Sequence, residues 1–141
     1  MNCQLEHANI TVQDIDRAIQ FLSTAFPHLK VRGGGESDHG TWQKKWLHLG
    51  TDDTYVALEE TTIAAKTDRK PAEETGINHV GFVVDDVEGI QQKMEAAGYK
   101  SAMAEPHPFR KRLYVTDGDG ITWEFVEYVS EDPAERNDYS L

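Results

Sequence analysis

Two separated stretches of the chain repeat the same succession of hydrophobic and polar positions. "LEHANITVQDID" begins at Leu5, "INHVGFVVDDVE" begins at Ile77, and the two correspond position by position at an offset of 72 residues. In each stretch, a run rich in apolar and β-branched residues is followed by an aspartate, Asp14 or Asp86, that suits the N-cap of a helix. The sequence therefore predicts an internal repeat in which each copy opens with a strand and a helix.

Hydrophobic periodicity and turn residues predict the other elements. The first copy is predicted to contain a strand at 5–12, a helix at 14–26 that Pro27 ends, a short strand at 29–32, and strands at 42–49 and 54–60. The stretch "GGGESDHG" (33–40) is expected to form a flexible loop, because three consecutive glycines disfavour regular structure. The second copy is predicted to contain a strand at 77–84, a helix at 86–97 that ends before Gly98, and strands at 99–103, 111–116 and 121–128.

This order predicts an α+β fold with two tandem βαβββ repeats. They are expected to form a curved mixed sheet around a cleft, with the helices on the outer face, because each amphipathic helix must bury its apolar side against a sheet. We expect the 141 residues to make a single domain. Repeat 1 should span about 4–60, a linker 61–75, repeat 2 about 76–129 and a polar C-terminal tail 130–141.

Composition narrows the function. The net charge of −11, from 14 Lys and Arg against 25 Asp and Glu, argues against nucleic-acid binding and, weakly, against strongly anionic substrates. No apolar run reaches the roughly 18 residues that span a bilayer, and the N-terminus lacks a signal-peptide pattern. The single cysteine, Cys3, excludes an internal disulfide and suits a reducing compartment. We expect a cytoplasmic protein that binds a small molecule.

Strand alternation predicts where the chemically capable side chains point. In "ITWEFVEY" (121–128), Trp123 and Phe125 share one face, and Glu124 lies on the other. The large apolar face must pack on the helix, so Glu124 is expected to face the cleft. The same alternation places His7 and His79 at equivalent cleft-facing positions of the first strands. Two histidines and a carboxylate suit a metal site, but strand histidines are often structural, and the residues alone leave both interpretations open.

Two further strands add candidates for the cleft. In "WLHL" (46–49) and "RLYV" (112–115), the leucines and valine suit the helix side, which leaves Trp46, His48, Arg112 and Tyr114 facing the cleft. Arg112 suits a substrate carboxylate or phosphonate, or alternatively extends its charge to solvent at a strand edge. His48 suits an acid or base, or a structural role.

The chain resembles the vicinal oxygen chelate superfamily, which includes glyoxalase I, fosfomycin-resistance proteins, methylmalonyl-CoA epimerase, extradiol dioxygenases and metal-free bleomycin-resistance proteins. The resemblance covers about residues 4–128. It rests on "LEHANITVQDIDRAIQFL", "INHVGFVVDDVEGI" and "YVTDGDGITWEFVEY", the last similar to the family ending "DPDGNxxEL". It implies a homodimer and one divalent metal ion (Mn, Ni, Zn or Fe) bound by His7, His79 and Glu124.

The resemblance is weaker at a fourth ligand that some members take from the last strand of the first half. Matching "ALEE" (57–60) to "EFVE" (124–127) places Ala57 there, and Glu59 would reach the position only after a two-residue shift in register. We expect three ligands, with Glu59 as the candidate fourth ligand or catalytic carboxylate.

The expected function is that of a glyoxalase-type metalloenzyme. It would be a lyase, isomerase or thiol transferase that chelates a small substrate through two adjacent oxygens. The alternatives are a metal-free resistance protein that binds an antibiotic or similar small molecule, and an iron-dependent extradiol-type dioxygenase. The fold resemblance specifies the reaction only weakly.

Overall fold

The computed structural model describes residues 3–140, and the chain forms two compact units, Met1–Asp68 and Arg69–Leu141. Unit 1 contains β1 (His7–Val12), α1 (Ile15–Ala25), β2 (Lys30–Asp38), β3 (Gln43–Gly50) and β4 (Tyr55–Thr61). Unit 2 contains β5 (His79–Val83), α2 (Val87–Ala96), β6 (Ser101–Met103), β7 (Arg110–Thr116), β8 (Thr122–Tyr128) and α3 (Pro133–Arg136). The predicted βαβββ order is confirmed in both units.

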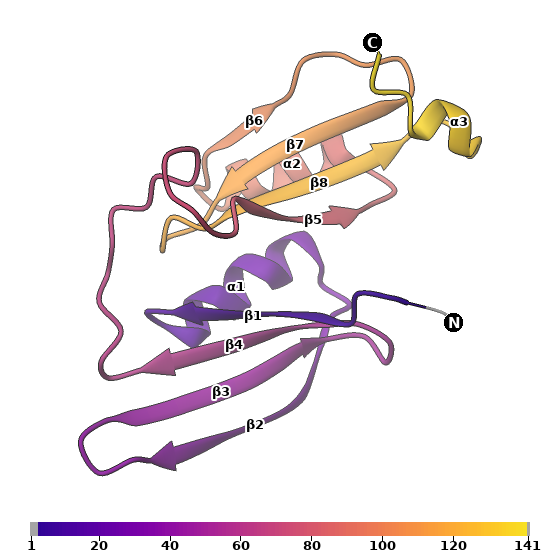
Figure 1. The fold of residues 1–141 in the computed structure, drawn as a ribbon. Coiled ribbons are helices and arrows are strands. Elements are labelled where there is room, and N and C mark those ends of the chain that lie inside the picture. Colours follow the sequence, from indigo (N-terminus) through magenta and orange to yellow (C-terminus); the bar gives the residue numbers. More distant parts are fainter. Residues whose placement is uncertain (1–2, 141) are drawn as a thin grey trace. The chain divides into compact units, whose positions relative to one another are not determined.

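Each unit builds one four-stranded mixed sheet with the same topology (Figure 1). The strand order is β1-β4-β3-β2 in unit 1 and β5-β8-β7-β6 in unit 2. The first strand pairs in parallel with the last strand of its unit, and the remaining pairs are antiparallel. Residues on the first and last strands of a unit therefore lie side by side in the sheet, although they are far apart in the chain.

The two long helices begin at the aspartates that the sequence indicated. The Asp14 carboxylate accepts the backbone N–H of Arg17 at 3.0 Å, and the Asp86 carboxylate accepts that of Gly89 at 2.8 Å. Each aspartate satisfies one of the N–H groups that the first turn of a helix leaves unpaired. Gly98 follows α2 with a φ of +89°, a conformation that glycine adopts without steric cost.

A glutamate on the last strand of each unit completes these helix starts. Glu60 Oε2 accepts the backbone N–H of Ile15 at 3.0 Å in unit 1. Glu127 Oε2 accepts that of Val87 at 2.9 Å in unit 2. The negative charge is favourable at the positive end of a helix. These matching contacts also fix the structural alignment of β4 with β8.

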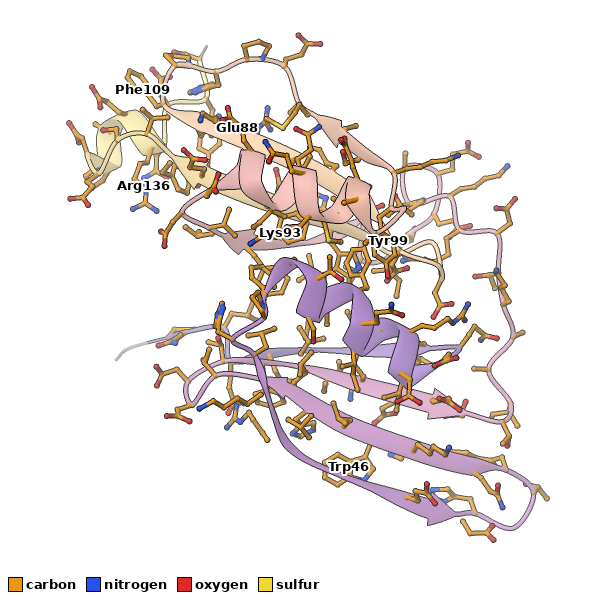
Figure 2. All side chains as sticks on the ribbon, turned by 180° about the vertical axis from the view of Figure 1, so that it is seen from behind. Trp46, Glu88, Lys93, Tyr99, Phe109 and Arg136 are labelled. Carbon is orange, nitrogen blue, oxygen red and sulfur yellow. The ribbon has the colours of Figure 1, made fainter. Side chains whose placement is uncertain are left out.

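The two long helices, α1 and α2, each cover one face of the sheet of their own unit, and Figure 2 shows both in front of their sheets. In unit 2, Trp123 and Phe125 are 1% and 0% exposed beneath α2, as strand alternation predicted. The indole N–H of Trp123 donates to Asp117 at 2.9 Å, which satisfies the polar atom of this buried ring. Glu124, between these two residues on β8, faces away from the helix.

The prediction of a loop at 33–40 is wrong, because most of it belongs to β2. Gly34 pairs with Leu47 and Gly35 with Trp46 across the β2–β3 ladder. A Cβ on Gly34 would lie 2.8 Å from the carbonyl oxygen of Trp46, and one on Gly35 would lie 3.0 Å from Trp46 Nε1. The glycines therefore permit a close strand approach and leave room for the indole, an effect of tertiary packing that local propensity does not reveal.

The polar C-terminal segment is attached to unit 2 through Arg110, which is 8% exposed. Its guanidinium donates to the carbonyl oxygens of Arg136 at 2.9 Å and Asp138 at 3.3 Å, and it lies 4.9 Å from the ring centroid of Tyr139. Figure 2 shows Arg136 at α3, next to the end of the sheet. Among residues 3–140, no helix is long and apolar enough to cross a bilayer.

Candidate functional site

His79 and Glu124 meet on the face of the unit 2 sheet that α2 leaves open. The parallel pairing of β5 with β8 places Gly81 opposite Glu124 and His79 one pleat away. His79 Nε2 lies 3.1 Å from Glu124 Oε2, and the two side chains are 34% and 13% exposed. The other carboxylate oxygen, Oε1, accepts the Tyr114 hydroxyl at 2.6 Å. One pleated face thus brings together three of the predicted side chains.

The preceding residue, Asn78, sets the orientation of the His79 ring. Asn78 Nδ2 donates to the carbonyl oxygen of Pro71 at 3.2 Å, which directs the amide oxygen to His79 Nδ1 at 2.9 Å. Nδ1 therefore carries a proton and donates it, and the second nitrogen, Nε2, faces the carboxylate. A nitrogen lone pair and a carboxylate oxygen repel each other at this distance. A proton between the two atoms, or a metal ion bound by both, would relieve this repulsion.

The hydroxyl of Tyr114 is a neutral hydrogen-bond donor in this arrangement. Burial, followed by the hydrogen bond to Glu124, raises the pKa of Tyr114 above its usual value, whereas nearby Arg112 lowers it. Arg112 lies on the same face of β7, two residues before Tyr114 and opposite Val126. Its Nε is buried and makes no hydrogen bond within the described part of the chain.

In unit 1, the predicted residues form a row of rings on the open face of the sheet. His7 stacks on Tyr55 with ring centroids 4.7 Å apart, and His48 stacks on Tyr55 at 4.5 Å. Trp46 lies 5.0 Å from His48, and Figure 2 shows it at strands β2 and β3. The Arg32 guanidinium carbon lies 4.4 Å from the Tyr55 ring centroid, in cation–π contact.

His7 repeats the arrangement of His79. Its Nδ1 lies 3.0 Å from Glu6 Oε2, so Nδ1 donates and Nε2 is again the nitrogen left for another partner. The side chain of His7 is 40% exposed. In both copies, the residue before the histidine holds the same ring nitrogen.

Glu59 occupies a different position from Glu124. The ladders pair Asn9 with Ala57 and Gly81 with Glu124, so Ala57 is the structural equivalent of Glu124. Glu59 lies one pleat further along β4. Its Oε1 is 3.3 Å from Lys44 Nζ and accepts the Asn9 amide at 3.3 Å. The negative charge of Glu59 is therefore already balanced by Lys44 on the neighbouring strand β3.

The predicted residues thus fall into two sets, one in each unit. The open face of the unit 2 sheet carries His79, Glu124, Tyr114 and Arg112. The open face of the unit 1 sheet carries His7, His48, Trp46 and Glu59. Within residues 3–140, no three His, Cys, Asp or Glu side chains are grouped closely enough to hold a metal ion. In unit 2, His79 and Glu124 approach each other to 3.1 Å, on the same face as Tyr114.

Sequence reasoning missed Asn78, Glu6 and Tyr55. For Glu6 and Asn78, the sequence contained a signal. A residue with a side-chain oxygen directly precedes the histidine in each copy, Glu6 in "LEH" and Asn78 in "INH". Tyr55 lies on the same predicted strand as Glu59, with the same side-chain alternation, so its position on the open face could have been inferred. Its contacts with both histidines depend on strand pairing and could not.

The sequence model of the Glyoxalase/Bleomycin resistance protein/Dioxygenase superfamily matches residues 4–125, and the chain belongs to this family. No curated protein sequence matches the chain.

Solved structures of this superfamily share the fold. The fosfomycin resistance protein FosX from Listeria monocytogenes is 18% identical with a TM-score of 0.66, over 93% of this chain and 98% of that one. The glyoxalase I of Leishmania major is 22% identical with a TM-score of 0.67, over 89% and 87%. TnmS3, an antibiotic binding protein from Streptomyces sp. CB03234, is 17% identical with a TM-score of 0.61, over 90% and 97%. At these identities, the comparisons establish the fold and leave the reaction open.

Proposed function

We propose that this protein is a divalent-metal-dependent enzyme of the glyoxalase type, a lyase, isomerase or thiol transferase. It acts on a small substrate that presents two adjacent oxygens to the metal. His79 and Glu124 are two of the proposed ligands, and His7, at the equivalent position of unit 1, is the third. The observation that carries the proposal is the 3.1 Å approach of His79 Nε2 to Glu124 Oε2, with the other polar atoms of both side chains already bonded.

The donor set fits a divalent ion. Imidazole nitrogen and carboxylate oxygen suit Mn²⁺, Fe²⁺, Ni²⁺ and Zn²⁺ and do not select among them. The hydrogen bonds from His79 to Asn78 and from Tyr114 to Glu124 are the outer contacts that usually orient metal ligands. A structure of FosX contains Mn(II) and sulfate, which supports a divalent ion in this fold. When bound, such an ion supplies Lewis-acid stabilisation of negative charge on substrate oxygens.

We propose separate roles for the other residues that the sequence singled out. Tyr114 holds Glu124 in place through its 2.6 Å hydrogen bond. Trp46, Tyr114 and Arg112 are proposed substrate contacts. His48 is our candidate for proton transfer, because its ring is held by stacking on Tyr55 and its side chain is half-buried. Glu59 is the weaker candidate as catalytic carboxylate or fourth ligand, since Lys44 and Asn9 already engage it.

A metal-free small-molecule binder is the second candidate function. The row of rings formed by His7, Tyr55, His48 and Trp46 favours it, because aromatic side chains supply much of the contact area in small-molecule sites. The structural likeness to TnmS3, an antibiotic binding protein, points in the same direction.

We also propose that the protein acts as a homodimer in the cytoplasm. Its family membership supports the homodimer, and its single cysteine supports the cytoplasm.

Metal content decides between these functions. We expect elemental analysis of the purified protein to find about one transition-metal ion per chain, retained after dialysis. His79→Ala and Glu124→Gln should each lower the metal affinity by more than about tenfold, because each removes a coordination bond. The matched control is His39→Ala. His39 stacks on Trp42 at the end of the β2–β3 hairpin, so its replacement should leave the metal affinity unchanged.

The outcomes separate the alternatives. Metal-free protein that binds an antibiotic tightly without turnover would favour the binder. Oxygen uptake by the Fe²⁺-loaded protein with a catechol would favour a dioxygenase. Equal metal affinity of wild type, His79→Ala and Glu124→Gln would contradict the proposed site.

A further inference from the structure

The C-terminal segment, residues 131–140, lies against the open face of the unit 2 sheet. Arg110 on β7 pairs with Tyr128 on β8, and Tyr114 pairs with Glu124 four residues away along each strand. Because side chains two residues apart on a strand share a face, Arg110 and Tyr128 point to the same side as Glu124. Both contact the segment. The segment therefore covers one end of the open face, and Figure 1 shows α3 at that end of β8.

Two hydrogen bonds and two cation–π contacts hold the segment in this place. The guanidinium of Arg110, a residue that is 8% exposed, donates to the carbonyl oxygens of Arg136 at 2.9 Å and Asp138 at 3.3 Å. Its Cζ atom lies 4.9 Å from the ring centroid of Tyr139, and the Arg136 Cζ atom lies 4.1 Å from that of Tyr128. A buried charge needs hydrogen-bond partners. The burial of Arg110 therefore depends on the carbonyl oxygens of the segment.

The covered end lies beyond the proposed metal ligand of β8. Tyr128 is four residues from Glu124, roughly 13 Å along a strand. Between them on the open face lies the half-buried Val126, which pairs with Val83 of β5, a residue that is 68% exposed. These two valines form a short apolar surface next to Glu124. Arg136, stacked on Tyr128, closes the end of that surface.

We propose that the C-terminal segment is a strap that closes this end of the substrate-binding face and restricts the substrate to compact molecules. The inference rests on the proposed function and specifies the size of its substrate. Arg110 acts through the segment and is therefore a positioning residue. A substrate with a long apolar chain directed over Val126 would meet the stacked pair of Arg136 and Tyr128, and it would bind only after the strap moves away.

The test combines hydrogen exchange with ligand binding on the full-length protein. Exchange of the backbone amides in 131–140 measures how firmly the strap is attached. Calorimetry of the Zn²⁺-loaded protein measures binding of catechol, 3-hexylcatechol and 4-hexylcatechol, which share a chelating pair of oxygens and direct the hexyl chain in two directions. Arg110→Met removes both hydrogen bonds to the strap. Lys111→Gln is the matched control, because it removes a positive charge from the adjacent residue, which points to the opposite face.

We expect Arg110→Met to accelerate exchange in the strap by about tenfold or more, as loss of one to two hydrogen bonds does, and to leave exchange in β8 unchanged. It should also tighten binding of at least one hexylcatechol relative to catechol by about tenfold, the gain from burying two methylene groups. Arg136→Ala removes only the contact with Tyr128, leaves no buried group unpaired, and should shift both measurements in the same direction. Lys111→Gln should match wild type in both.

Each part of the inference has its own contradicting result. Unchanged exchange in both strap variants would show that these contacts do not hold the segment. Faster exchange with unchanged relative affinities for the three ligands would overturn the restriction on substrate size and leave the metal site standing. Failure of the Zn²⁺-loaded wild type to bind catechol would contradict the proposed function, and the restriction on its substrate with it.

Discussion

At the scale of single residues, the histidines of the two repeats are held in the same way by the residue before them. Glu6 lies 3.0 Å from His7 Nδ1, and Asn78 lies 2.9 Å from His79 Nδ1. A hydrogen bond at Nδ1 fixes the proton there and leaves Nε2 for a metal. A merely packed surface histidine would have no need for the same ring orientation in both copies. The repeated orientation supports a shared role for Nε2.

We predict that Asn78 positions His79 for metal binding. Asn78→Leu removes the acceptor at Nδ1 and should weaken metal affinity by about tenfold to a hundredfold, the usual effect of losing an outer contact of a metal-bound histidine. Asn78→Asp keeps the acceptor and should bind metal at least as tightly as wild type, although it loses the donor to Pro71. Calorimetric titration of Zn²⁺ into the metal-free variants would measure both effects.

The pair of variants distinguishes positioning from simple stability. Circular dichroism of both variants establishes that they fold. If Asn78→Leu folds and binds Zn²⁺ with wild-type affinity, the hydrogen bond to Asn78 has no part in the metal site.

At the scale of elements, strand β8 carries core residues of unit 2 on one face and the candidate metal ligand Glu124 on the other. Phe125 is 0% exposed on the α2 side. Glu124 and Val126 lie on the open face, where Val126 is half-buried. Because successive side chains of a strand point to opposite faces, one seven-residue strand supplies both a hydrophobic layer and a ligand face.

The alternation predicts unequal costs for two truncations on this strand. Phe125→Ala should lower the free energy of unfolding by roughly 3–5 kcal/mol, because it leaves a cavity in a packed core. Val126→Ala, on the open face one residue away, should cost less than about 1 kcal/mol, since it removes little buried area. Chemical denaturation of both variants would measure the difference. Equal losses would mean that the open face is covered in solution.

At the scale of the whole molecule, a bound metal would couple the site to the stability of the chain. A ligand that binds only the native state adds about 2.7 kcal/mol at a concentration 100 times its Kd. For a chain of this size, that corresponds to a rise in Tm of roughly 5–10 °C. The repeat-related histidines should therefore contribute more to the Tm when metal is present than when it is absent.

Thermal melting with and without metal tests this coupling. We expect the metal-free forms of wild type and His79→Ala to melt at similar temperatures, and only wild type to gain stability when Zn²⁺ is added. The purely structural interpretation makes the opposite prediction. His79→Ala would then lower the Tm by the same amount with and without metal, because the lost contacts would not involve the ion.

The sequence by itself determined the order of the elements, the helix starts and the faces of the strands. These features follow from short-range rules, namely the period of apolar residues, the capping ability of Asp14 and Asp86, and the alternation along 121–128. The same rules placed Glu124, Tyr114 and His79 on one face, because strand alternation requires no knowledge of the partner strand.

Tertiary structure alone decided the features that depend on how strands and loops pack against one another. Gly34 and Gly35 join a strand because β3 approaches them closely, although isolated glycines favour a loop. Asn78 orients His79 only because the carbonyl oxygen of Pro71 receives its amide. These contacts arise from strand pairing in the first case and from the path of the loop before β5 in the second, and no local pattern of the sequence encodes them.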